Sequence, residues 1–78
     1  MKEISDLGLI AGLITLGYAP VKREKQGKRV MFYFESDPQL EQLCRDFYDH
    51  RLMVNAFDMH MALKQVKTSI FQITNGTD

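Results

Sequence analysis

Residues 18–35 read YAPVKREKQGKRVMFYFE, and this stretch decides the fold. Two strand-like segments flank a turn at Gln26-Gly27, which is typical of a β-hairpin. Because successive strand residues point to opposite faces, Phe32 and Phe34 share one face of the second strand. Pro20 has no backbone N–H to donate, so the first strand is predicted to lie at a sheet edge.

The register of the hairpin depends on the length of its loop. A two-residue loop at Gln26-Gly27 sets Glu24 opposite Arg29. A three-residue loop, with Gly27 in the left-handed conformation of a bulge, sets Arg23 opposite Arg29, and like charges facing each other are unfavourable. The first register is therefore favoured. It pairs Val21 with Phe32 and Ala19 with Phe34, and these four side chains share an apolar face with Val30.

Three helices are predicted around the hairpin, and together they indicate a single α+β domain of order α-β-β-α-α. They cover about 5–16, about 37–50 and about 55–72, with a frayed polar tail at 74–78. Ser5, Asp37 and Asn55 are the expected N-caps, and Gly17 fits the position just past the first helix. The predicted core is Val30, Phe32, Phe34, Leu43, Phe47 and Leu63.

The first helix is apolar nearly all round. One stripe contains Leu7, Ile10, Ala11 and Ile14, and a second contains Leu9, Leu13 and Leu16. Such a helix is either central to its domain or shared with a second subunit. A domain of 78 residues cannot easily cover it on every side. We therefore expect a homodimer, with either the strand edge or the first helix at the contact, and with Leu9, Leu13 and Leu16 as the contact residues of the helix.

Residues that could carry chemistry are few. Cys44, the single cysteine, belongs to the predicted buried stripe of the second helix, and the two histidines, His50 and His60, have no metal-ligand spacing. No glycine-rich loop that could hold a phosphate is present. We expect no enzyme activity, no catalytic residue, no metal, no cofactor and no small-molecule substrate.

The apolar run at 7–16 is too short to span a bilayer. Glu3 and Asp6 precede it where a signal peptide would carry positive charge. One cysteine excludes an intrachain disulfide and suits a reducing compartment. These features predict a cytoplasmic protein that does not act at a membrane.

Charge is concentrated at the tip of the hairpin. Five basic residues, Lys22, Arg23, Lys25, Lys28 and Arg29, surround one acid, Glu24, for a local charge of +4 in a chain whose net charge is zero. Basic side chains at a hairpin tip could contact the phosphates of DNA or RNA. Edge strands also carry lysine and arginine merely to prevent pairing with other strands.

The layout resembles a known family. Leu16-Gly17-Tyr18 ends a helix, Phe32-Tyr33-Phe34-Glu35 forms a strand, and Phe47-Tyr48, Val54-Asn55 and Leu63-Lys64 follow. This pattern is similar to a family of short uncharacterised bacterial proteins, a domain of unknown function that also occurs in phages and integrated elements. The resemblance implies an α-β-β-α-α unit and a mobile-element origin. It implies no catalytic or binding residue.

Two functions are compatible with these observations. The first is a non-catalytic interaction protein, an adaptor or inhibitor that binds another protein or itself, because the helices carry more apolar surface than one small core needs. The alternative is a small DNA- or RNA-binding protein that uses the hairpin tip.

Overall fold

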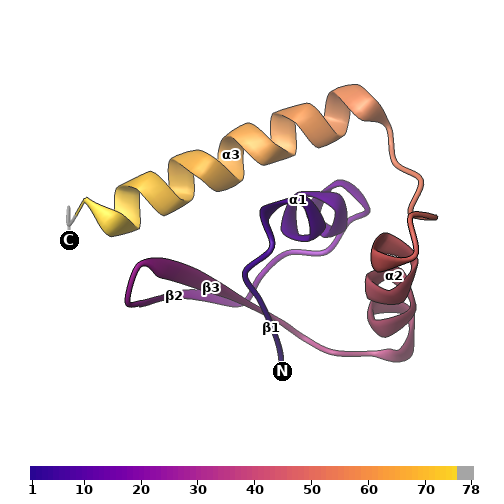
Figure 1. Ribbon diagram of the computed structural model, residues 1–78, viewed down its shortest axis with the longest axis horizontal. Coiled ribbons are helices and arrows are strands. Elements are labelled where there is room, and N and C mark those ends of the chain that lie inside the picture. Colours follow the sequence, from indigo (N-terminus) through magenta and orange to yellow (C-terminus); the bar gives the residue numbers. More distant parts are fainter. Residues whose placement is uncertain (76–78) are drawn as a thin grey trace.

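The structure is a computed structural model that describes residues 1–75. These residues form three strands and three helices. Figure 1 shows them in one α+β unit. The elements in chain order are β1 (Lys2–Ile4), α1 (Leu7–Thr15), β2 (Lys22–Gln26), β3 (Arg29–Phe34), α2 (Pro38–Tyr48) and α3 (Ala56–Thr74). The predicted α+β class and the order helix, hairpin, helix, helix are confirmed, with one strand added before the first helix.

The added strand, β1, makes the sheet three-stranded. The strand order is β1-β3-β2, so β3 is central and β2 lies at an edge, as the proline before it predicts. β1 pairs antiparallel with β3, with Lys2 opposite Phe34 and Ile4 opposite Phe32. Ile4 is buried and joins the core cluster. This strand was not predicted because three residues are too few to establish an alternating pattern.

The hairpin register differs from both predicted registers. Its loop is Gly27-Lys28, and Gln26 lies opposite Arg29. Gly27 has a φ of 64°, and the first of two loop residues is where a type II′ turn requires glycine. Glutamine was a poor fit for that position, so the loop moves one residue along. Glu24 therefore lies opposite Met31, and not opposite Arg29.

The predicted apolar face of the hairpin is correct for β3 and wrong for the segment before β2. Val30, Phe32 and Phe34 are buried together, because the register moved by an even number of residues and kept each β3 side chain on its face. Val21 and Ala19 precede β2 and are exposed. Phe32 pairs instead with Arg23.

The ends of α1 are fixed by local hydrogen bonds. Asp6, and not Ser5, is the N-cap, because its carboxylate accepts from the backbone N–H of Leu9 at 3.1 Å. At the other end Gly17 has a φ of 101°, and its N–H donates to the carbonyl of Ile14 at 3.0 Å. The N–H of Tyr18 donates to Leu13 at 3.0 Å, which completes a Schellman motif. The expected role of Gly17 is confirmed.

The expected caps of α2 and α3 are also confirmed. Asp37 accepts from the N–H of Leu40 at 2.7 Å, with Pro38 in the first turn of α2. Asn55 accepts from the N–H of Asp58 at 2.9 Å. Helix α3 continues to Thr74, beyond its predicted end, and the rest of the predicted frayed tail, 76–78, lies outside the described residues.

Helix α1 is the centre of the domain. Figure 1 shows it surrounded by α3, α2 and the sheet. The inner side of α3 packs on the core through Val66, with Ile70 and Ile73 partly buried beside it. The predicted core members Leu43 and Phe47 are partly buried and pack against the core cluster, and Leu63 is also partly buried. The neighbouring elements of the same chain therefore bury most of the apolar surface of α1.

Within residues 1–75, no helix combines the length and apolar character needed to cross a membrane.

Candidate functional site

The five basic residues of the hairpin do not form one surface. All five are exposed, but alternation along β2 places Lys22 on one face of the sheet and Arg23 on the other. The ammonium of Lys22 lies 4.7 Å from the ring centroid of Tyr33. Arg23 donates a hydrogen bond to Ser69 of α3. Both side chains therefore contact the protein itself.

The acid within the basic tip is held by a tyrosine. Tyr33 donates its phenolic O–H to Glu24 at 2.9 Å, and Gln26 donates its side-chain N–H to the Tyr33 oxygen at 3.0 Å. The bond from Tyr33 lowers the pKa of the Glu24 carboxyl, and the same bond raises the pKa of Tyr33. A charged Glu24 thus stays among the basic residues and reduces the field that they present to a polyanion.

Lys25 and Lys28 test the role of this tip directly. If they serve only solubility, changing both to glutamate should alter the free energy of unfolding by no more than about 0.5 kcal/mol. We expect this result, and only weak binding of duplex DNA by the parent protein. If they bind phosphates, the slope of log affinity against log salt should shrink by about 0.9 for each phosphate interaction removed. A gel shift with duplex DNA over a salt series, together with urea denaturation, makes both measurements.

DNA binding tighter than about micromolar at physiological salt would contradict our expectation, since non-specific binding is usually no stronger than that. If changing Lys25 and Lys28 to glutamate weakened such a complex, the DNA-binding site would lie at the hairpin tip. Competition by free duplex DNA separates this outcome from binding of a protein partner at the same residues.

Two of the three residues predicted as oligomer contacts on the first helix are buried inside the domain. Leu9 and Leu13 are 1% and 0% exposed, and only Leu16, at the end of α1, remains 39% exposed. The prediction failed at the first two residues because other helices of the same chain, α3 and α2, pack against α1. The homodimer itself stays a prediction, without these two residues in its interface.

Large apolar side chains are exposed elsewhere, along the second half of the chain. Helix α3 presents Phe57, Met61 and Phe71, and Tyr48 and Met53 are exposed at the end of α2 and in the link to α3. The three α3 residues belong to a series spaced by four and three residues, completed by Lys64 and Thr68. We call these five residues the outer stripe of α3. This spacing places them along one side of a helix, away from buried Ala62 and Val66.

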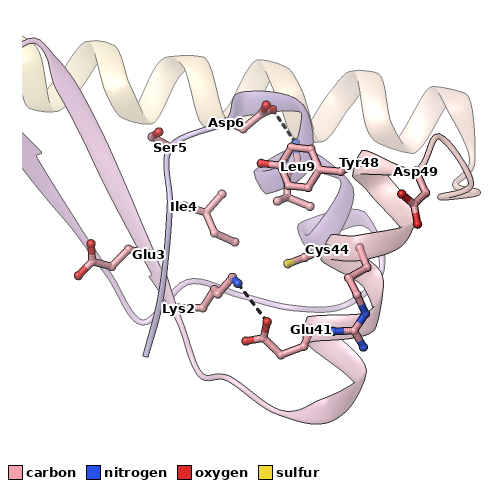
Figure 2. A pocket seen from close by; sticks show the side chains of 11 residues that line it. Lys2, Glu3, Ile4, Ser5, Asp6, Leu9, Glu41, Cys44, Tyr48 and Asp49 are labelled. Atoms are coloured by element: carbon pink, nitrogen blue, oxygen red, sulfur yellow. Dashed lines mark hydrogen bonds and ion pairs between the residues drawn. The ribbon is translucent and has the colours of Figure 1, made fainter.

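A groove of about 750 Å³ lies between β1 and α2. Figure 2 shows Ile4 and Lys2 pointing from β1 towards Cys44 and Glu41 on α2. The ammonium of Lys2 is 3.0 Å from a Glu41 carboxylate oxygen, and Ser36 donates to the other oxygen at 2.6 Å. Ser36 and then Lys2 lower the pKa of Glu41 by these hydrogen bonds. The ion pair joins the start of the chain to α2 across one end of the groove.

Cys44 lies at the base of this groove and is 5% exposed. Burial raises the pKa of its thiol, so the thiolate is disfavoured. His50, two residues past the end of α2, and His60, on α3, are both exposed. Within residues 1–75, no three histidine, cysteine or acidic side chains gather closely enough to hold a metal ion.

Sequence reasoning missed both the groove and the outer stripe. The groove depends on β1, which the sequence did not reveal. The outer stripe had a readable signal, because Phe57, Met61 and Phe71 stand in heptad spacing. The longer stripe through Val66 and Ile70 is the stronger signal, however, and it marks the inner side of α3.

Comparison with known proteins gave one match. Residues 2–72 match the family model described as "Domain of unknown function (DUF5659)". No curated protein and no solved structure matches the chain.

Proposed function

The chain belongs to the family named Domain of unknown function (DUF5659), and we propose that it is a non-catalytic interaction protein. It acts by contact with other protein surfaces, as an adaptor or inhibitor, and its second copy is the partner that the exposed surface fits best. The single observation behind this proposal is the outer stripe of α3, an apolar surface that the domain does not use for its own core.

Helix α3 is apolar on two sides. Its inner side covers α1 through Val66 and its neighbours, which satisfies the needs of the fold. On the outer stripe Phe57 is 67% exposed, Phe71 is 65% exposed and Met61 is 41% exposed. Exposed aromatic side chains of this size are enriched where proteins bind one another. Leaving them in water is unfavourable, and burial against a partner would remove that cost.

The outer stripe fits a second copy of itself. In a two-fold interface, if one residue contacts a second residue of the partner copy, that second residue contacts the first in return. Two α3 helices packed antiparallel about Lys64 bring Phe57 of one copy to Phe71 of the other, because both lie seven residues from Lys64. The two Lys64 side chains then meet at the centre, where their long stems can carry the ammonium groups out to water.

Sedimentation equilibrium over a wide concentration range tests this proposal. The double variant Phe57→Ser with Phe71→Ser should weaken self-association at least tenfold, since buried aromatic anchors carry about 2 kcal/mol or more each. Met53→Ser removes a side chain that is 85% exposed but lies outside the outer stripe, and it serves as the matched control. Thermal melts of the parent and both variants show whether the fold is retained.

Equal self-association of the double variant and the parent would contradict the proposed contact. Weakening by Met53→Ser to the same degree would place the contact in the link between α2 and α3. A parent protein that stays at the 9.0 kDa chain mass at every concentration would remove the second copy as partner.

Nucleic-acid binding is the less supported alternative. Lys22 and Arg23 already contact Tyr33 and Ser69, and Glu24 follows them in the same strand.

We also propose a cytoplasmic location, which the single cysteine supports. An origin in a phage or another mobile element is supported by the resemblance alone.

A further inference from the structure

The groove between β1 and α2 combines an open strand edge with an apolar base. Within residues 1–75, β1 pairs with β3 on one side only, and its Lys2 and Ile4 side chains point into the groove beside the unpaired edge. Ile4, Leu9 and Cys44 line its base, and each of them is at most 5% exposed. Figure 2 looks into this groove with β1 and α2 as its two walls. A strand edge beside a helix is the arrangement in which several domains bind an extended peptide.

The register shows which backbone groups of β1 are available. Gln26 and Arg29 flank a two-residue loop and form a hydrogen-bonded pair, and such pairs alternate along the ladder. The backbone groups of Tyr33 therefore point to β2, and those of its two neighbours in β3 point to β1. Glu3 lies opposite Tyr33, so the N–H and C=O of Glu3 point to the open side. An added strand would pair with these two groups.

Charge defines what kind of strand fits. Four acids and two bases line the groove. At one end Lys2 and Glu41 neutralise each other at 3.0 Å. Towards the other end Figure 2 shows the carboxylates of Asp6 and Asp49, and the nearest basic partner of Asp49 is the exposed Arg51 at 3.5 Å. Such an exposed pair is weak, so this end favours a positively charged side chain.

We propose that the β1–α2 groove binds an extended, basic segment of a partner protein as a fourth strand of the sheet. The segment pairs with the backbone of Glu3. One apolar side chain of the segment lies on Ile4 and Cys44. A lysine or arginine two residues along the segment shares its face and lies towards Asp6 and Asp49. This inference rests on the proposal that the protein acts by binding other proteins, and it uses a surface separate from the outer stripe of α3.

The probe is the capped peptide acetyl-Thr-Val-Thr-Lys-Thr-amide, whose valine and lysine are two residues apart and therefore share one face of a strand. It is titrated into the isotope-labelled full chain and followed by amide NMR. We expect shifts in β1 and in the side of α2 that faces it. Glu3→Pro removes the outward N–H without removing a bond to β3, and edge strands tolerate proline at such a position. It should weaken binding by about three- to tenfold, the value of one hydrogen bond.

Glu3→Gln is the matched control, because it loses the same charge and keeps the N–H. It should bind more tightly than the proline variant. The peptide acetyl-Thr-Val-Thr-Glu-Thr-amide should bind at least tenfold more weakly than the lysine peptide if the acidic end selects charge. Retained protection of the Phe32 and Phe34 amides from exchange would show that β1 still pairs with β3 in the proline variant.

Equal affinities of the proline and glutamine variants would overturn the proposal, as would shifts confined to α3 or no binding at millimolar peptide. The double variant Phe57→Ser with Phe71→Ser separates the two surfaces. If that variant loses self-association and binds the peptide as before, both proposals stand. If the parent never self-associates but binds the peptide in the groove, only the outer stripe is refuted.

Discussion

Replacing Phe34 by alanine is expected to lower the free energy of unfolding by about 3–5 kcal/mol, which is enough to unfold much of the protein. Phe34 is 0% exposed and lies in the central strand of the sheet. Deleting its ring removes buried apolar surface and leaves a cavity that the β1 and β2 neighbours cannot fill without breaking their pairing. Urea denaturation followed by circular dichroism measures the loss.

Met31→Ala is the control for this prediction. Met31 lies three residues before Phe34 on the opposite face of β3, and it is only partly buried. Its replacement should cost clearly less. If instead Phe34→Ala melts within a few degrees of the parent and Met31→Ala unfolds the protein, the inner and outer faces of β3 have been exchanged in our account.

Replacing Leu13 by alanine is the second change with a large expected effect. Leu13 is 0% exposed at the centre of α1, so the loss should be about 2–5 kcal/mol. The loss should not depend on protein concentration, because the contacts of Leu13 lie within one chain. Denaturation at two concentrations at least tenfold apart measures this. Leu16→Ala, at the partly exposed end of the same helix, should cost much less.

A different pattern would restore the interface predicted from the sequence. If Leu13→Ala left the unfolding of the dilute protein unchanged and reduced only its self-association, Leu13 would lie between subunits. Helix α1 would then not be the covered centre of the domain.

Local signals in the sequence predicted most of the fold. Asp37 and Asn55 were identified as caps from residue type and position alone, and Gly17 from its place after an apolar run. Each makes its contacts within a few residues, so no tertiary information was needed. The strand β1 was missed for the opposite reason. β1 is a strand because it pairs with β3, some thirty residues later in the chain. A segment of three residues carries too little pattern to predict such a distant pairing.

The predicted hairpin register was wrong because of the conformation that the turn requires. Charge pairing favoured Glu24 opposite Arg29, but an exposed charge pair is worth at most about 1 kcal/mol. Placing Gln26 at positive φ costs as much or more, and the observed register gives that conformation to Gly27 instead. Backbone strain decided the register, and the charges rearranged around Tyr33.

The candidate site was predicted only in part. The basic residues of the tip were found, but strand alternation distributes them over two faces, which depends on the register. The stripe of Leu9, Leu13 and Leu16 was assigned to an interface because the helices that pack on α1 follow only after the hairpin, and α3 begins forty residues beyond Leu16. Much of the apolar surface that remains exposed is on α3 itself. The sequence alone does not show which apolar side of α3 is buried. The structure shows it, because one side packs against α1.

The central claim is that this protein acts by binding protein surfaces through the outer stripe of α3, first of all in a second copy. Sedimentation equilibrium of the parent chain and the Phe57→Ser, Phe71→Ser variant at equal concentrations tests it most directly. We predict that the mean mass of the parent rises from the 9.0 kDa chain mass towards twice that value with concentration, while the variant remains near 9.0 kDa. Indistinguishable mass curves for the two proteins would contradict the account.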